Sequence, residues 1–225
     1  MCEARVSDMN IMDTGKILSE TLDVLRKGGV ILYPTDTVWG LGCDATDAEA
    51  VARIFSIKKR DDSKSLVLLA SDLDMVARFV REVPEMAVQL VEVNDRPMTI
   101  IYPGAIAAPA PSGQSGEEGP EVSPVRRTNH YELAHNVVAA DGSVGIRIPM
   151  MDFCRDLVHR LGRPIVSTSA NISGEPTPKV FNDISAVIRD AVDYIVEPSL
   201  EKGATGQSSS IIKVGVDSTI QIIRK

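Results

Sequence analysis

The sequence predicts an α/β domain built on a twisted, partly parallel sheet flanked by helices. Short apolar runs typical of buried strands alternate with segments whose apolar residues recur at helical spacing, and this alternation favours helices packed on a largely parallel sheet. The chain has 225 residues, of which 44% are hydrophobic and 24% charged, which is typical of a soluble protein with one well-packed core. We therefore expect residues 1–225 to form a single domain.

The first predicted unit is a helix followed by a buried strand at residues 30–33. Asp13 or Thr14 is expected to cap the helix, and Gly28 and Gly29 are expected to end it. The apolar face of this helix consists of Ile17, Leu18, Leu22 and Leu25.

A second helix and a strand at residues 65–69 complete a strand–helix–strand unit. Asp47 is expected to cap this helix, and Lys58 falls on its inward-facing side at the far end. The residues that define this inward side are Val51, Ile54 and Phe55.

The second half of the chain repeats the alternation. Its predicted elements are a strand at 144–148, a helix from Asp152 to Gly162, a strand at 164–168, a helix after Asn182, and strands at 210–213 and 220–223. The helix after Asn182 is predicted from an apolar face of Ile184, Val187, Ile188, Ala191 and Val192.

Residues 103–131 interrupt this pattern with five prolines, several glycines and two adjacent glutamates. Structureless loops longer than about 12–15 residues are uncommon unless they are functional or disordered. Two interpretations therefore stay open, a flexible surface insertion and a mobile lid that carries Arg126, Arg127 or His130.

Composition and motifs exclude several classes of protein. The net charge of −7 argues against broad, non-specific binding to nucleic acid, and no apolar run reaches the roughly 18 residues of a membrane span. Three separated cysteines and an N-terminus without an apolar secretory core favour a cytoplasmic protein. The three histidines lack metal-ligand spacing, so we predict no protein-bound metal. Residues 40–45 match a dinucleotide fingerprint only weakly, and the glycines are better explained by tight packing of a loop.

Polar clusters at the ends of predicted elements are the candidate site. Lys58 offers a compact charge and Arg60 a planar fork, both suited to phosphate or carboxylate. Ser169 and Asn171 lie two apart on an extended segment and therefore project the same way. Each cluster taken alone is also typical of a solvated turn or of a polar cap on a strand, as is the pair Thr35 and Thr37. No nucleophile motif is present, so charge placement and substrate positioning are the expected mechanism.

In combination, these clusters resemble the YrdC-like threonylcarbamoyl-AMP synthases over residues 11–224. The motifs that carry the resemblance are Tyr33-Pro34-Thr35-Asp36-Thr37 with Gly40-Leu41-Gly42, Lys58-x-Arg60, Gly145-Ile146-Arg147-Ile148-Pro149, Ser167-Thr168-Ser169-Ala170-Asn171 with Ser173-Gly174, and residues 206–212. The chain departs from the family pattern at Trp39, where tyrosine is common, and at Asp61, where proline is usual.

The resemblance implies a twisted α/β sheet with one concave, positively lined cavity. It further implies that L-threonine, bicarbonate and ATP, with Mg²⁺ carried on the phosphates, form threonylcarbamoyl-AMP and pyrophosphate, and that a partner complex then modifies tRNA. The residues that resemble threonine contacts are Thr35, Arg147, Ser169 and Ser209. Those that resemble nucleotide contacts are Lys58, Arg60, Ser143, Asn171 and Arg224, of which Lys58 and Arg60 are also the expected catalytic charges.

Two other functions stay open at this point. The first is a non-catalytic module that binds double-stranded RNA, tRNA or ribosomes, which the basic cluster at 58–64 favours and the acidic net charge opposes. The second is a carbamoyl-transfer module like those of hydrogenase maturation proteins, which normally lie in far longer chains with zinc-finger-like cysteines.

Overall fold

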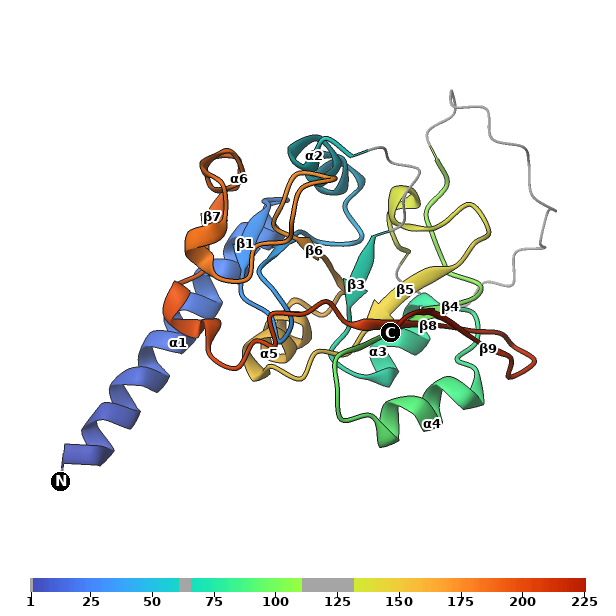
Figure 1. Cartoon of the computed structure of the whole chain (residues 1–225), viewed down its shortest axis with the longest axis horizontal. Helices are drawn as coiled ribbons and strands as arrows, with labels where there is room; N and C mark the ends of the chain where they lie inside the picture. The colour runs from blue at the N-terminus through green and yellow to red at the C-terminus, as the bar shows by residue number, and fades with distance from the viewer. Residues whose placement is uncertain (1, 61–65, 111–131) are drawn as a thin grey trace.

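The computed structural model describes residues 2–60, 66–110 and 132–225, and its elements alternate as in an α/β protein (Figure 1). The first half contains α1 (Cys2–Arg26), β1 (Ile31–Tyr33), β2 (Gly40–Gly42), α2 (Ala48–Lys58), β3 (Val67–Leu69), α3 (Leu73–Phe79), α4 (Glu85–Val93) and β4 (Met98–Tyr102). The second half contains η1 (His135–Val137), β5 (Val144–Arg147), α5 (Asp152–Leu161), β6 (Ile165–Ser169), η2 (Phe181–Asp183), α6 (Ala186–Asp190), β7 (Tyr194–Ile195), η3 (Pro198–Glu201), β8 (Ser210–Val214) and β9 (Ile220–Arg224).

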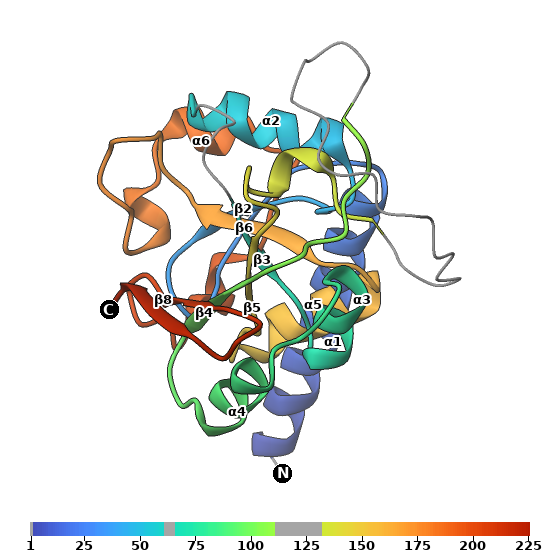
Figure 2. The same ribbon diagram turned by 90° about the vertical axis from the view of Figure 1, so that its right-hand side faces the viewer.

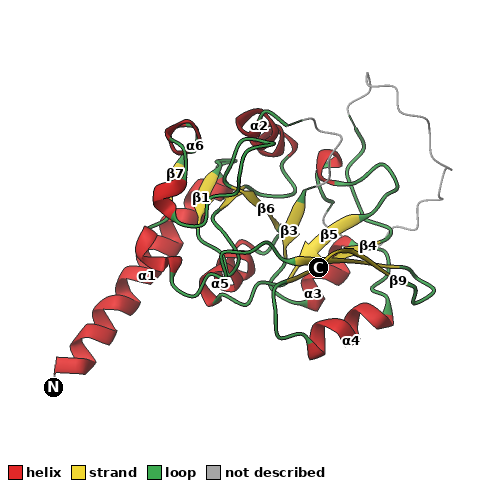
Figure 3. Ribbon diagram, viewed as in Figure 1, coloured by secondary structure: helices red, strands yellow, loops and turns green. Residues whose placement is uncertain are grey.

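Within the described residues the strands form one mixed sheet in the order β7-β1-β2-β6-β3-β5-β4-β8-β9. The pairs β1–β7, β3–β5 and β4–β8 are parallel, and the other neighbours are antiparallel. In Figure 2, α2 lies on one side of the twisted sheet while α1, α3 and α5 lie on the other, and Figure 3 shows the same two-sided cover. The predicted fold class, a twisted and partly parallel sheet flanked by helices, is therefore confirmed.

The first helix is longer than predicted. It continues through Asp13 and Thr14, so the prediction that one of them caps its start is wrong. Asp and Thr cap the start of a helix only where the backbone before them is not helical. Here the helix already includes the residues before them, so both lie inside it. The predicted buried residues Leu18, Leu22 and Leu25 do lie in the core, and the helix ends as expected at Gly28, whose φ is +75°.

Residues 40–42, predicted to be a tightly packed loop, form the strand β2 between β1 and β6. The close packing is real, because a Cβ on Gly42 would lie 2.7 Å from the Tyr33 ring and 2.9 Å from the carbonyl oxygen of Val166. Gly42 thus lets the Tyr33 ring lie against the backbone of β2 and β6.

The helix predicted after Asn182 is broken into η2 and the short α6, which Ser185 caps through the backbone N–H of Ile188. Ile184 and Ile188 are buried as predicted, whereas Val187 is 61% exposed. The prediction that these residues form one continuous buried face is therefore wrong.

The sequence analysis assigned no element to residues 70–102, which hold α3, α4 and β4. Residues 103–110 of the predicted insertion form isolated bridges, Ala105 with Val80 and Ala107 with Leu133. Residues 111–131, with Arg126, Arg127 and His130, lie outside the described residues, and the choice between insertion and lid stays open. No helix in the described part of the chain is long and apolar enough to cross a membrane.

Candidate active site

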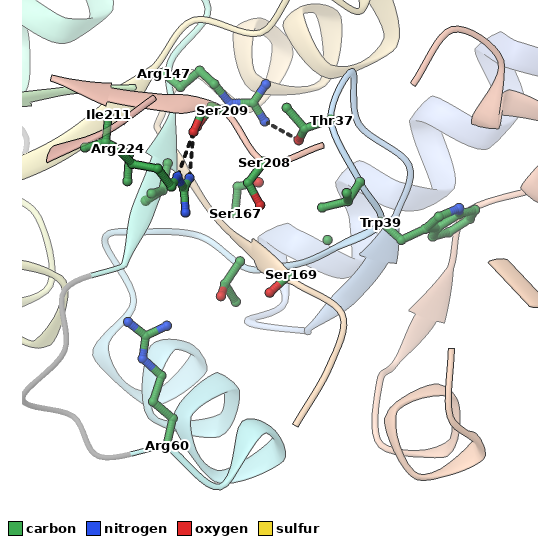
Figure 4. Close-up of a pocket in the computed structure, with 14 residues that line it drawn as sticks. Thr37, Trp39, Arg60, Arg147, Ser167, Ser169, Ser208, Ser209, Ile211 and Arg224 are labelled. Carbon is green, nitrogen blue, oxygen red and sulfur yellow. Dashed lines mark hydrogen bonds between the residues drawn. The ribbon is translucent and has the colours of Figure 1, made fainter. Parts of the chain in front are cut away.

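A cavity of about 250 Å³ lies where the ends of β2, β5 and β6 meet the β8–β9 hairpin (Figure 4). Three arginines and six hydroxyl side chains line it, and its lining among the described residues contains no carboxylate. The complete lining is Thr37, Val38, Trp39, Gly40, Arg60, Val67, Arg147, Ser167, Thr168, Ser169, Ser208, Ser209, Ile211 and Arg224. Such a lining favours anionic groups, because its guanidinium and hydroxyl groups donate hydrogen bonds, and Asp36, the carboxylate paired with Arg147, lies outside it.

The sheet register explains why distant residues meet here. Ser167 and Ser169 are two apart in β6, so their side chains project from one face of the sheet. In the neighbouring strands Val67 pairs with Ser167, and Gly40 pairs with Ser169. A Cβ on Gly40 would lie 3.4 Å from the Tyr33 ring and 3.6 Å from the Ser167 hydroxyl, so the lining is closely packed at this position.

Arg147 ends β5 and is 3% exposed, with its guanidinium in an ion pair with the buried carboxylate of Asp36. Its other terminal nitrogen lies 3.4 Å from the Thr37 hydroxyl. The second oxygen of Asp36 accepts a hydrogen bond from the backbone N–H of Met150 at 3.0 Å. Asp36 therefore neutralises Arg147 and fixes its orientation, which is what allows the two charges to be buried.

Thr35 lies behind the pocket and does not line it. Its hydroxyl donates to the Val38 carbonyl at 2.8 Å and lies 2.8 Å from the hydroxyl of Thr37. The side chain that reaches the cavity is Thr37, which the sequence analysis named only as a turn residue. Because Thr35 and Thr37 are two apart on an irregular segment, their sequence alone did not distinguish which of them would face a ligand.

Lys58 ends α2, the helix that Asp47 caps as predicted by accepting from the backbone N–H groups of Glu49 and Ala50. The ammonium of Lys58 donates to the carbonyl oxygens of Ser169 and of Asn171, the latter at 2.8 Å. Burial, and secondarily the charge of Arg60, lowers the pKa of Lys58 to about 8, so the side chain stays mostly charged at neutral pH. The structure thus brings Lys58 to the backbone behind the pocket, where it does not itself line the cavity.

Arg60 does line the cavity, and Figure 4 shows its side chain reaching toward the other arginines from the end of α2. Two backbone bonds close the helix, from Lys59 N to Ser56 O and from Arg60 N to Phe55 O. Lys59 adopts φ of 47°, the left-handed conformation of a helix C-cap. This turn redirects the chain and points Arg60 at the pocket, where burial lowers its pKa.

Ser169 and Asn171 are joined by a hydrogen bond of 2.5 Å from the serine hydroxyl to the amide oxygen. The Asn171 amide nitrogen donates to the carbonyls of Ile172 and Glu175. Ser169 faces the cavity, whereas Asn171 is absent from its lining and holds the loop that follows β6.

Ser209 and Arg224 bring the C-terminal hairpin to the pocket. The Arg224 guanidinium donates to the Ser209 carbonyl through two nitrogens, at 2.9 and 2.7 Å, and burial lowers its pKa. The Ser209 hydroxyl lies 2.7 Å from that of Thr99. These bonds join β8, β9 and β4 along one wall of the cavity.

Ser143, like Thr35, Lys58 and Asn171, is a predicted site residue that does not line the pocket. It precedes β5, at the opposite end of the strand from Arg147, and its hydroxyl donates to Asp141 at 2.6 Å. Asp141 in turn accepts from the Lys213 ammonium at 2.6 Å. The sequence analysis missed the pocket residues Thr37, Ser167, Thr168 and Ser208. Of these, Ser167 could have been found, because it lies two positions before Ser169.

Among the residues that the structure describes, no group of three or more His, Cys, Asp or Glu side chains could hold a metal ion. The implied Mg²⁺ would be carried on the substrate phosphates, so no protein side chain is needed to coordinate it.

Comparisons with known proteins agree with this fold. The model of the Sua5/YciO/YrdC family, described as "Telomere recombination", matches residues 23–225. The threonylcarbamoyl-AMP synthase of Chromohalobacter salexigens is 30% identical, with 82% of this chain and 87% of the relative covered. Among solved structures, Escherichia coli YciO superposes with a TM-score of 0.69 at 23% identity, covering 93% of this chain and 89% of that one.

A second structural neighbour is Pyrococcus abyssi Sua5 complexed with L-threonine, with a TM-score of 0.69 at 23% identity. The alignment covers 89% of this chain but 51% of the Sua5 chain, so this protein spans about half of that relative's length. The family model and the curated relative agree with the motifs found in the sequence. The chain therefore belongs to the Sua5/YciO/YrdC family.

Proposed function

We propose that this protein is an L-threonylcarbamoyl-AMP synthase. The observation that carries the proposal is the gathering of Arg60, Arg147 and Arg224 around one hydroxyl-lined cavity. Family membership supports it, since curated relatives carry the name threonylcarbamoyl-AMP synthase. The substrates are L-threonine, bicarbonate and ATP, the products are threonylcarbamoyl-AMP and pyrophosphate, and the reaction class is nucleotidyl transfer.

The chemistry requires two anions to meet. The threonine amine and bicarbonate give a carbamate and one water molecule. An oxygen of the carbamate then attacks the α-phosphorus of ATP while the bond to pyrophosphate breaks. In water this approach is opposed by charge repulsion, whereas fixed cations in a partly enclosed cavity offset it without reorganising. Mg²⁺ on the ATP phosphates would neutralise further negative charge when bound.

The positions of the side chains assign some of them to threonine and others to the phosphates of ATP. Arg147, held by Asp36, is assigned to the threonine carboxylate, and the hydroxyls of Thr37 and Ser169 to its polar groups. Arg60 and Arg224 approach from other sides of the cavity and are assigned to phosphate oxygens. About 250 Å³ is less than a whole nucleotide pocket usually needs, so we place the reacting groups inside and the adenine toward the open side.

Lys58, Asn171 and Thr35 act from behind the lining. Lys58 and Asn171 fix the backbone and hydroxyl of Ser169, and Thr35 fixes Thr37. This assignment changes the expected role of Lys58 from a phosphate contact to a positioning residue. The activated threonylcarbamoyl group would then pass to a tRNA-modifying partner complex.

The proposal is tested by incubating the protein with ATP, L-threonine and bicarbonate and measuring pyrophosphate. Release should require all three substrates, and Arg60→Ala should reduce it at least about tenfold, since a charge-assisted contact is worth roughly 1.5–3 kcal/mol. The matched control is Arg96→Ala, whose side chain is 88% exposed, and its rate should equal that of the wild type. Pyrophosphate release that is independent of threonine or bicarbonate would refute a synthase, and tight RNA binding without turnover would favour the non-catalytic alternative.

A further inference from the structure

Among the strands that the structure describes, β9 forms one of the two edges of the sheet, and it is unusually apolar for such a position. It is last in the strand order, paired with β8 on one side, and all five of its residues are exposed. Exposed fractions reach 47% for Ile220, 59% for Ile222 and 50% for Ile223, and Val216 in the hairpin turn is 65% exposed. These four are half of the large apolar residues that are exposed in the described part of the chain.

Edge strands in soluble monomers are normally protected by charged residues, because their unpaired backbone groups otherwise bind another strand. Between Ile220 and Ile223, β9 carries no charge. The charged residue within the strand, Arg224, is turned to the pocket and bonded to the Ser209 carbonyl. The outer edge of β9 therefore combines free hydrogen-bonding capacity along the backbone with apolar side chains on both faces.

We propose that the outer edge of β9 binds β9 of a second copy of this chain. The two strands would run antiparallel across a two-fold axis through Gln221, which joins the two sheets edge to edge. This inference rests on the fold and the sequence of the hairpin and is independent of the proposed enzymatic function.

The sequence of the hairpin selects this register. An axis through Gln221 places Ile220 opposite Ile222 of the second copy, twice, on one face of the sheet.

The neighbouring symmetric registers are less favourable. An axis through Ile222 would set each Ile220 against Arg224 of the second copy. An axis through Ile220 would set each Ile222 opposite Ser218, which precedes the strand and has a φ of 64°. A shift to the next symmetric register changes every cross-strand pair, so Ile220 and Ile222 face each other twice only with Gln221 on the axis.

Sedimentation equilibrium of the full chain tests the proposal. The wild type should pass from monomer to dimer between about 1 and 100 µM, the range expected of a small interface. Ile222→Lys should remain monomeric at every concentration, because it places an unpaired ammonium against Ile220 of the second copy. The control Val187→Lys alters a 61% exposed residue on α6 and should dimerise like the wild type. A wild-type protein that stays monomeric, or an Ile222→Lys variant that dimerises normally, would overturn the proposal.

Discussion

The ammonium of Lys58 lies 2.8 Å from the backbone carbonyl of Asn171, a residue 113 positions away in the sequence. It also donates to the carbonyl of Ser169, so one buried side chain at the end of α2 fixes the main chain at the end of β6. The pocket wall that carries Ser169 therefore depends on a contact from the helix behind it.

We predict that Lys58→Met lowers both stability and activity. The variant keeps the length of the side chain but leaves two buried carbonyls without their charged donor, which should reduce the free energy of unfolding by on the order of 2 kcal/mol. Urea unfolding measures this loss, and Arg60→Ala is the comparison, since it should lose turnover with little loss of stability. Equal stability of Lys58→Met and the wild type would show that the ammonium does not hold the β6 end.

Asp36 should be as important to the pocket as the arginine it holds. Asp36→Asn preserves the shape of the side chain but leaves Arg147 buried without a counter-ion, so unfolding should become easier by about 3 kcal/mol. The same variant should raise KM for threonine more than KM for ATP, because Arg147 is assigned to the threonine carboxylate.

A double variant distinguishes the effect of an unpaired charge from the effect of altered packing at the Asp36–Arg147 pair. Asp36→Asn combined with Arg147→Met removes both charges and should recover part of the stability lost in Asp36→Asn alone, as measured by urea unfolding. Losses that simply add would indicate that the two side chains do not depend on each other.

Gly42 should tolerate no side chain. Gly42→Ala would place its Cβ 2.7 Å from the Tyr33 ring and 2.9 Å from the Val166 carbonyl oxygen, and relieving the overlap should cost about 1–3 kcal/mol. The matched control is Gly15→Ala in α1, where the new Cβ meets no atom within 4 Å and the helix should gain roughly 0.5–1 kcal/mol. Thermal unfolding should shift in opposite directions for the two variants, and a shift of the same sign would contradict the packing described for β2.

Asp141 should make stability depend on pH in the acid range. Hydrogen bonds from Lys213 and then Ser143 lower the pKa of Asp141 to about 2, from an ordinary value of 3.8. Between these two values the unfolded state binds more protons than the folded state, so the stabilisation is complete above pH 4 and is lost as the pH falls toward 2. The effect is small because the carboxylate is largely exposed.

Asp141→Asn removes this titration. The difference in free energy of unfolding between the wild type and the variant, measured in urea at several pH values, should decrease from pH 5 to pH 2. A difference that stays constant over this range would exclude Asp141 as a source of acid sensitivity.

The sequence by itself determined the fold class, the family and most of the core. Apolar periodicity placed α2, α5, β5 and β6, because these elements bury one complete side or are buried on both. It failed at the start of α1 and at α6, where capping residues were ambiguous and a short helix could not present a full apolar face. Five of the nine predicted site residues line the cavity: Arg60, Arg147, Ser169, Ser209 and Arg224.

Only the tertiary structure decided how these residues divide their roles. Asp36 lies next to the predicted site residue Thr35 in the sequence. Its role, however, is the ion pair with Arg147, which lies 111 residues away. Ser143 and Arg147 are four residues apart and lie at opposite ends of one strand, so nearness along the chain did not bring them to one ligand. Local sequence encodes which side of an element is buried, whereas the contacts that orient a charge depend on which strands become neighbours in the sheet.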